Sequence, residues 1–379
     1  MRIAIVRTMP NFSMDVHADG IVAGLKTVRP DWEIVEVAPT PVDRHSRSWR
    51  LRLYKFYERF WSFPNQVKQQ AANADIVHII DHSEGHIVRW VKQTNAHVVV
   101  TCHDLINALY QGNLKGSVKV PFLSNGLWMY SVRSMRKSDR IISVSATTAK
   151  DITRILQIEP SRIDVVPNAV EGIFQPLSDE RIATIRQRLG VPPGHLCLLN
   201  VGSNHPRKNL STILDSITQL HQKGVAVKLL KVGADFTTEQ QQWIQNQGLE
   251  QVVDYLGNPD KSTLVEIYNA ADILIAPSLH EGFGMTLLES MACGTPVITS
   301  NVSAMPEVVE DAGVLINPTN VDELAAAILQ LRHDSERYQD FVQRGLTRAK
   351  AFTWEIVAEQ IAQAYERLPK SVVKAVVTV

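Results

Sequence analysis

Short runs of β-branched and other apolar residues recur along the chain, and most are followed by a longer segment with the amphipathic period of a helix. This alternation predicts parallel β-sheets covered by helices. In the first half the predicted strands are Ile3–Val6, Ile34–Val37, Ile76–Ile79, Val98–Thr101, Arg140–Val144 and Asp164–Val166. In the second half they are Leu196–Val201, Val227–Val232, Val252–Tyr255, Ile273–Ala276, Val297–Thr299 and Val314–Ile316. The pattern therefore predicts two successive doubly wound α/β units.

A segment rich in proline and glycine, from Pro167 to Pro193, separates the two sets of strands and carries one amphipathic helix around residues 179–189. At 379 residues the chain is too long for a single core and fits two domains. We place the first domain at residues 1–172 and the second at residues 173–352. A last helix is predicted near Trp354–Leu368, with Thr353 as its N-cap.

The composition indicates a globular protein but does not indicate an activity. Hydrophobic residues make up 45% of the chain and charged residues 21%, as in a globular protein. The formal net charge is zero, so the overall charge of the chain does not indicate a nucleic-acid partner. The three cysteines lie far apart in apolar sequence and are predicted to be reduced core residues. The chain opens directly on a strand, and no apolar run approaches the ~20 residues of a membrane span. We therefore expect a cytoplasmic protein.

The most informative segment starts at the predicted strand Ile273–Ala276, which leads into a loop with Glu281 and two glycines, then a helix carrying Glu289. Glycines let the backbone approach a ligand closely, and a helix beginning at about Met285 presents free N–H groups. A diphosphate fits at such a helix end. The two carboxylates suit the hydroxyl groups of a hexose and a ribose, so the segment predicts half of a nucleotide-sugar pocket. The alternative is an ordinary βαβ unit with solvated glutamates.

A second loop directly follows the strand Leu196–Val201 and reads Gly202-Ser-Asn-His-Pro-Arg207-Lys208-Asn209. Glycine at the strand end permits close backbone approach, while Arg207 supplies a fork of donors and Lys208 a point charge, both suited to a diphosphate. Ligands of doubly wound sheets bind beyond the carboxyl ends of the strands, where both loops fall. Taken alone, this loop reads equally well as a solvated turn before a helix.

Together these segments resemble the signature of the family-4 retaining glycosyltransferases of the GT-B fold. The resemblance rests on two glutamates separated by seven residues, on Gly-Phe-Gly after the first, and on the turn Met291-Ala-Cys-Gly-Thr-Pro296 after the second. It implies an α/β fold of two Rossmann-like domains facing a central cleft. Residues 1–172 would then form the acceptor domain and residues 173–352 the donor domain, with a C-terminal helix over residues 353–368 crossing back to the first.

The resemblance also implies a role for each loop. Glu281 would contact the donor sugar, Glu289 the ribose, and Arg207 with Lys208 the diphosphate, replacing a metal ion as the stabiliser of developing charge. No metal or other cofactor is expected. Base contacts would come from the loops after the next two strands. The predicted donor-binding residues are Gly202, Ser203, Arg207, Lys208, Val232, Gly233, Leu256, Gly257, Glu281, Gly282, Phe283, Gly284, Met285, Thr286 and Glu289.

On the acceptor side, His103 lies just beyond the C-terminal end of the strand Val98–Thr101 and, with Asp104, resembles the family's active-site histidine, which lies beside the transferred sugar. The resemblance implies that the departing phosphate oxygen takes the acceptor proton, so His103 is predicted to contact the sugar. The predicted catalytic residues are His103, Glu281, Arg207 and Lys208.

One segment departs from the family pattern. Where the family carries a Gly-Gly pair after the first strand, this chain has a bulkier loop with Met14 and Asp15. The predicted acceptor-binding residues are Asp15, His17, His103 and Asp104. An equally good reading of the segment is a capped helix start at Ser13 or Asp15.

The segment Arg44–Phe63 predicts a helix of a different character. Aromatic and apolar side chains share one face (Trp49, Leu53, Phe56 and Phe60), and basic ones share another (Arg52, Lys55 and Arg59), with Arg47 and Arg50 nearby. Such a helix can lie at an anionic membrane surface. The alternative is a helix packed on the first sheet with a solvated basic face.

The sequence therefore predicts a retaining glycosyltransferase that moves a hexose from a nucleotide diphosphate sugar, with GDP-mannose slightly favoured, to a glycan or lipid-linked acceptor. The protein is expected in the cytoplasm or bound peripherally at the cytoplasmic face of the membrane, with a role in polysaccharide biosynthesis. A nucleotide-sugar epimerase or a phosphorylase on the same architecture is an alternative, although no pyridoxal-bearing lysine motif stands out. A non-catalytic sugar-binding protein is the alternative from another class.

Overall fold

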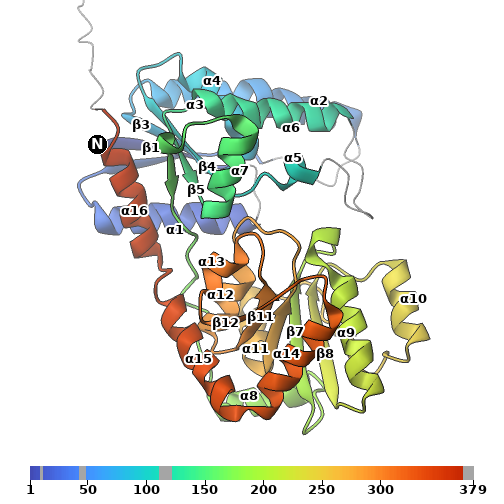
Figure 1. Cartoon of the computed structure of the whole chain (residues 1–379). Coiled ribbons are helices and arrows are strands. Elements are labelled where there is room, and N and C mark those ends of the chain that lie inside the picture. The colour runs from blue at the N-terminus through green and yellow to red at the C-terminus, as the bar shows by residue number, and fades with distance from the viewer. Residues whose placement is uncertain (9–11, 42–47, 111–121, 370–379) are drawn as a thin grey trace, which may run out of the picture. The chain divides into compact units, whose positions relative to one another are not determined.

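A computed structural model of the protein describes residues 1–8, 12–41, 48–110 and 122–369. The chain divides into two compact units, and each is built on its own parallel sheet of six strands (Figure 1). The first unit contains Met1–Leu109, residues 122–169 and the helix that begins at Trp354, and the second contains Val170–Thr353. The two doubly wound sheets predicted from the alternation of apolar runs are thus confirmed.

In the first unit the strand order is β2-β1-β3-β4-β5-β6, and every predicted strand is present. The order reverses between β1 and β3, which makes this point the topological switch of the sheet. The strands are β1 (Arg2–Val6), β2 (Glu33–Val37), β3 (Ile76–Ile79), β4 (His97–Cys102), β5 (Arg140–Ser143) and β6 (Ile163–Val165).

Both faces of this sheet are buried, which explains why its strands read as continuous apolar runs. Ile3 and Ile5 of β1 pack with α1 (Phe12–Val28) and α16 (Trp354–Glu366), whereas the alternate residues Ala4 and Val6 pack in a second cluster with α3 and α4. The other helical segments of this unit are α2 (Trp49–Tyr57), a π-helical turn (Glu58–Ser62), α3 (Phe63–Ala71), α4 (Val88–Val91), α5 (Ile106–Tyr110), α6 (Phe122–Ser134) and α7 (Ala146–Leu156), with short 3₁₀ turns at His82–Ile87, Met135–Lys137 and Pro160–Arg162.

The C-terminal helix α16 lies against α1 in the same unit (Figure 1). Two glycines of α1 make the close approach possible, because a Cβ on Gly20 would lie 2.1 Å from the Trp354 ring and one on Gly24 would lie 2.6 Å from Ala358. Arg29 at the end of α1 forms ion pairs of 2.8 Å with both Glu359 and Glu366. The helix ends at Glu366, two residues before the predicted end.

In the second unit the strand order is β12-β11-β10-β7-β8-β9, which is the dinucleotide-binding order 3-2-1-4-5-6 when its strands are counted along the chain. Its switch point lies between β7 and β10. The strands are β7 (Leu196–Gly202), β8 (Val227–Gly233), β9 (Val253–Tyr255), β10 (Ile273–Ala276), β11 (Val297–Ser300) and β12 (Gly313–Ile316).

The helices of the second unit cover its sheet in two groups. Apolar side chains of α9 (Leu210–Gln222), α10 (Thr238–Asn246) and α14 (Val321–His333) share one buried cluster with the strands, and Phe341 of α15 (Ser335–Ala349) also belongs to it. The helices of the second group contact one another. They are α8 (Asp179–Arg188), α11 (Lys261–Ala270), α12 (Met285–Ala292), α13 (Met305–Val309) and α15. A 3₁₀ turn spans Pro206–Lys208.

Several local predictions need correction. The helix α1 already begins at Phe12, so Met14 and Asp15 lie in its first turns and not in a loop. The predicted helix over residues 44–63 is divided into α2 and the π-helical turn, while Arg44 and Arg47 fall outside the described residues. All three cysteines are free and buried, as predicted. None of the described helices has the length and apolar character needed to cross a membrane.

Candidate active site

Two loops meet at the switch point of the second sheet, one after β7 and one after β10. Asn209 ties them together with its side-chain amide, which donates to the carbonyl oxygens of Pro277 at 3.0 Å and Pro318 at 2.6 Å. Asn209 adopts the left-handed conformation, with φ 58°, which asparagine tolerates better than most residues. The backbone N–H of Leu279 also donates to the carbonyl of Arg207 at 2.7 Å. The fold thus brings Arg207, Lys208 and Glu281 to one place, although they are distant in sequence.

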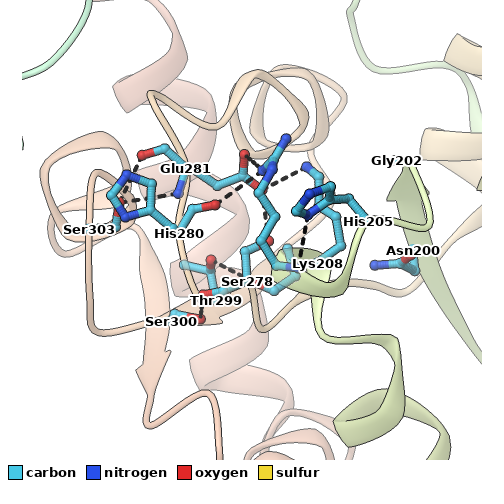
Figure 2. A network of polar contacts seen from close by, with 12 residues as sticks. Asn200, Gly202, His205, Lys208, Ser278, His280, Glu281, Thr299, Ser300 and Ser303 are labelled. Atoms are coloured by element: carbon cyan, nitrogen blue, oxygen red, sulfur yellow. Dashed lines mark hydrogen bonds and ion pairs between the residues drawn. The ribbon is translucent and has the colours of Figure 1, made fainter. Parts of the chain in front are cut away.

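Arg207, Lys208 and Glu281 form one ion cluster, and Figure 2 labels Lys208 and Glu281. The Glu281 carboxylate lies 2.5 Å from Arg207 Nη1 through Oε2 and 2.6 Å from Lys208 Nζ through Oε1. Glu281 is 8% exposed, and the side chains of Arg207 and Lys208 are 20% and 15% exposed. Because two positive charges face one negative charge, the cluster keeps a net positive charge that is only partly screened by water.

Two serines fix the position of Glu281. Ser278 Oγ donates to Glu281 Oε1 at 2.8 Å, and Ser303 Oγ donates to the Glu281 carbonyl at 2.8 Å while accepting its N–H at 3.1 Å (Figure 2). Burial on its own raises the pKa of the Glu281 carboxyl, but Lys208 and Arg207 outweigh it and hold the pKa below its ordinary value. The carboxylate is therefore ionised and rigidly held at neutral pH.

The helix α12 begins beside Glu281 and carries the second glutamate. Gly284 is its N-cap, with φ 110°, so the helix N-terminus starts at Met285 as predicted. One turn later the half-buried Glu289 accepts a hydrogen bond of 2.6 Å from the Tyr268 hydroxyl. Burial raises the pKa of Glu289, although the Tyr268 hydrogen bond opposes that rise. Glu289 is thus positioned through one oxygen.

The predicted base-binding loops lie next to Gly202 at the ends of adjacent strands. The Ala234 N–H donates to the Gly202 carbonyl at 3.2 Å, and the Gly233 N–H donates to the Gly257 carbonyl at 2.8 Å. Gly233 has φ 103°, and a Cβ there would lie 2.2 Å from the Gly202 oxygen. The backbone therefore needs glycine at this point, and the ends of β7 and β8 carry no side chain of their own at Gly202 and Gly233.

The other predicted donor-binding residues differ in burial and in their contacts. Phe283 is buried, and its ring makes an edge-on contact with Phe352 at 5.9 Å between centroids, which is a packing role. Ser203 is exposed, whereas Met285 and Thr286 are half-buried in the first turn of α12. The Leu256 N–H donates to the Lys231 carbonyl at 2.8 Å, which extends the β8–β9 pairing.

In the first unit, His103 follows β4 and contacts other histidines. Its ring lies 4.8 Å from that of His17 on α1 and 6.4 Å from that of His82 after β3, between centroids. His103 Nε2 lies 2.9 Å from the Ile80 carbonyl, so this nitrogen is the protonated donor and Nδ1 is the acceptor of the neutral ring. Burial lowers the pKa of His103, although Asp81 opposes that change.

The predicted acceptor residues are only partly brought together. His17 is buried beside His103, and burial followed by the charges of His103 and His78 lowers its pKa well below the ordinary value. Asp104 instead accepts a hydrogen bond of 3.1 Å from the Ile106 N–H at the start of α5, and Asp15 lies 3.9 Å from Arg7. His17 and His103 form one cluster, while the two aspartates have local partners.

Several side chains of the site were not predicted from the sequence. Ser278 and Ser303 hold Glu281, Tyr268 holds Glu289, and His205 accepts the Arg207 N–H at 3.2 Å. Only the pattern Arg-Lys-Asn gave a hint, since asparagine suits the left-handed turn found at Asn209. Within the described ranges no group of three or more His, Cys, Asp or Glu side chains is arranged to hold a metal ion, and metal independence stays a prediction.

Two family models match the chain, one on each unit. The model of glycosyltransferase family 4 matches residues 25–171, and the model of glycosyl transferases group 1 matches residues 181–348. The two matches together cover most of the chain and meet at the proline- and glycine-rich segment between the sheets.

Similar proteins with curated names include two from Escherichia coli. The O-antigen chain mannosyltransferase B is 31% identical over 239 residues, which cover 62% of this chain and 62% of that protein. The serotype-specific mannosyltransferase WbdA is 25% identical over 309 residues, which cover 78% of this chain and 37% of that protein. The aligned part of this chain thus spans less than two thirds of either relative.

Solved structures with the same fold match nearly the whole chain. Sucrose-phosphate synthase from Thermosynechococcus elongatus superposes with a TM-score of 0.75 at 22% identity, covering 97% of this chain and 98% of that one. Anabaena HepE in complex with UDP and glucose also superposes with a TM-score of 0.75, at 18% identity, covering 97% of this chain and all of that one. At 22% and 18% identity, this structural similarity shows that the chain has the same fold, and it shows no more than the fold.

Proposed function

Because this chain belongs to the group 1, family-4 glycosyltransferases of the GT-B fold, we propose that it is a retaining glycosyltransferase using a nucleotide diphosphate sugar as donor. It transfers a hexose to a glycan or lipid-linked acceptor. The observation that carries the proposal is the cluster of Arg207, Glu281 and Lys208, held at the switch point of a dinucleotide-type sheet beside the N-terminus of α12.

In this proposal each part of the cluster meets a different part of the donor. Arg207, Lys208 and the first turn of α12 stabilise the negative charge that grows on the diphosphate as the sugar departs, in place of a metal ion. Glu281, already fixed by Ser278 and Ser303, accepts hydrogen bonds from sugar hydroxyls. Glu289, positioned by Tyr268, accepts from the ribose. The glycine-lined strand ends receive the base.

The donor sugar is proposed from the relatives and not from the site. Two of the similar proteins are named mannosyltransferases, which favours GDP-mannose as the donor. HepE, which shares the fold, is described in complex with UDP and glucose, so the fold also accommodates a uridine nucleotide. On the acceptor side, we propose that the His17–His103 pair contacts the transferred sugar or the acceptor, with His103 Nδ1 as a hydrogen-bond acceptor.

The first test is a thermal-shift screen against GDP, UDP, ADP and their common sugar conjugates without added metal. A ligand that binds only the native state stabilises it by RT ln(1 + [L]/Kd), or about 2.7 kcal/mol at ~100 Kd. We expect one nucleotide to raise the melting temperature, and Arg207→Ala to reduce this shift at the same ligand concentration. A lack of response to every nucleotide would contradict the proposed donor site.

The same screen leads to a test of catalysis. The conjugate that gives the largest shift is incubated with the protein, and release of the nucleoside diphosphate is measured with and without candidate acceptors. Tight donor binding with no hydrolysis or transfer would favour a sugar-binding protein. A visible absorbance band of pyridoxal in the purified protein would favour a phosphorylase.

We further propose that α2 and the following π-helical turn contact an anionic membrane surface. No residue of α2 is buried, and its apolar side chains are strongly exposed: Trp49 by 66%, Leu53 by 60%, Phe56 by 52% and Tyr57 by 54%, followed by Trp61 by 61%. Arg50 and Arg52 are exposed on the same helix. Arg59 is instead paired with Glu84 at 3.0 Å and does not join this basic face.

An exposed aromatic face next to exposed arginines matches the chemistry of an interfacial helix, and no residue of α2 is buried as packing on the first sheet would require. Phe60 of the predicted face is instead half-buried, and its ring lies 4.6 Å from that of His86 between centroids. This proposal places the enzyme at the cytoplasmic face of a membrane, where a lipid-linked acceptor would lie and where its free thiols stay reduced.

Sedimentation with phosphatidylglycerol vesicles tests this surface. We expect the wild-type protein to bind these vesicles in low salt and to bind phosphatidylcholine vesicles poorly, because the helix combines apolar and basic side chains. The double variant Trp49→Ser, Phe56→Ser is expected to lose binding. Trp243→Ser is the control, since Trp243 is 41% exposed on a different unit. Equal binding by wild type and double variant would refute the assignment.

A further inference from the structure

Lys231 is a lysine with no exposed surface, and it lies in strand β8, between β7 and the edge strand β9. Its ammonium group donates to the carbonyl oxygens of Gly202 and Val232, both at 2.7 Å. No carboxylate forms an ion pair with it among the residues that the structure describes. A second lysine of the same strand, Lys228, has the ordinary arrangement, with an ion pair of 2.8 Å to Asp254 at the other end of the strand.

The two carbonyl groups that Lys231 binds lie where the donor site is proposed. Gly202 ends β7, and Val232 precedes the glycine that ends β8. Gly202 also carries the stem of Lys208 on its other side, since a Cβ on Gly202 would lie 3.2 Å from Lys208 Cε. Gly202 is therefore contacted by two lysines, Lys208 of the ion cluster and Lys231 of the neighbouring strand β8.

Carbonyl groups at the carboxyl ends of parallel strands are a difficulty for an anion site. They carry partial negative charge at the edge of the sheet where ligands bind, and so they repel a diphosphate. An ammonium group that binds two of them cancels this effect and adds a full positive charge. A merely structural donor would not need to be charged, and burying a charge without a counter-ion is costly.

We propose that Lys231 is a positioning residue of the diphosphate site, which holds the ends of β7 and β8 and supplies positive charge from beneath the glycine turn. The inference rests on the proposed function, because the ligand is the diphosphate of a nucleotide sugar. Lys231 does not touch the phosphate. It acts through the Gly202 peptide and through its charge, and it strengthens binding of diphosphate compounds over uncharged nucleosides.

The charges around Lys231 predict that the affinity for a diphosphate depends on pH. Burial, with a smaller contribution from the charge of Lys208, lowers the pKa of Lys231 to about 8, although Asp235 opposes both effects. The other polar side chains on the flanking strands at its register are Asn200 and Tyr255. A bound anion favours the charged ammonium and raises this pKa, so binding takes up a proton above about pH 8. Diphosphate affinity therefore falls as the pH rises through this range.

The test compares Lys231→Met with Lys228→Met, which makes the same substitution in the same strand at the end remote from the glycines. Titration calorimetry measures the affinity of the nucleoside diphosphate that gives the largest thermal shift, and of its parent nucleoside. For Lys231→Met we expect an affinity loss of about tenfold or more for the diphosphate, the size of one charge-assisted interaction, and no comparable loss for the nucleoside. Lys228→Met is expected to lower the melting temperature without changing the diphosphate affinity.

A second readout is the number of protons taken up on binding at pH 9, obtained from titrations in buffers of different ionisation enthalpy. We expect uptake in the wild type and a loss of it in Lys231→Met. Unchanged diphosphate affinity in Lys231→Met would overturn the inference, as would an equal loss for diphosphate and nucleoside, which indicates local collapse. If the wild type binds no nucleoside diphosphate at all, the proposed function itself fails.

Discussion

Replacing Arg207 or Lys208 with alanine is expected to lower kcat/KM for sugar transfer by about ten- to a hundredfold or more. Both side chains are largely buried and meet at Glu281, so the pair of cations and the carboxylate together carry one net positive charge. Either substitution leaves one cation beside one carboxylate. The cluster then has no net positive charge to stabilise the leaving diphosphate, and this loss is felt most strongly in the transition state.

The measurement is steady-state transfer with the donor identified in the thermal-shift screen. Arg188→Ala is the matched control, because Arg188 pairs with Glu266 on the exposed side of α8 in the same unit. It is expected to turn over at nearly the wild-type rate. Near wild-type values of kcat/KM in both Arg207→Ala and Lys208→Ala would rule out the diphosphate assignment.

Glu281→Gln raises the net positive charge of the same cluster, whereas the alanine variants lower it. The substitution keeps the shape of the side chain and leaves two cations without their carboxylate, so the nucleoside diphosphate is expected to bind at least as tightly as to wild type. Transfer is nevertheless expected to slow, because the amide is a weaker acceptor for the sugar hydroxyls. Weaker diphosphate binding in Glu281→Gln would contradict the electrostatic account of the cluster.

Gly233→Ala is expected to destabilise the protein by roughly 3 kcal/mol, from a strained left-handed backbone together with overpacking. Gly233 has φ 103°, and an added Cβ would lie 2.2 Å from the Gly202 oxygen, which belongs to the backbone and cannot rotate away. For a unit of this size we expect a fall in melting temperature of about 6–12 °C. The displaced Gly202 peptide should also weaken diphosphate binding.

Gly224→Ala separates the two causes of this effect. Gly224 also has a positive φ of 73°, but a Cβ there would have no atom within 4 Å. Its alanine variant therefore bears only the backbone cost, about 1 kcal/mol, and is expected to bind the donor normally. If the two variants unfold at the same temperature, the contact between the ends of β7 and β8 is not tight, and the rigid glycine surface proposed for the base is wrong.

The sequence by itself determined the elements and their order. All twelve strands were predicted because a strand buried on both faces must be apolar along its whole length, and such runs are visible without any structure. Glycine at the ends of β7 and β8 and the start of α12 at Met285 were equally readable, since close approach and helix ends depend on local residue types.

Partners and charge states were decided only by the tertiary structure. Arg207 and Glu281 lie 74 residues apart, and their ion pair exists because the reversal of strand order places β7 next to β10. Lys231 looks like an ordinary lysine in a strand, and its complete burial depends on the packing around β8, which the local sequence does not specify. Local sequence specifies which backbone conformation a segment adopts. Electrostatic interactions depend on distance in space, which the packing of remote segments alone sets.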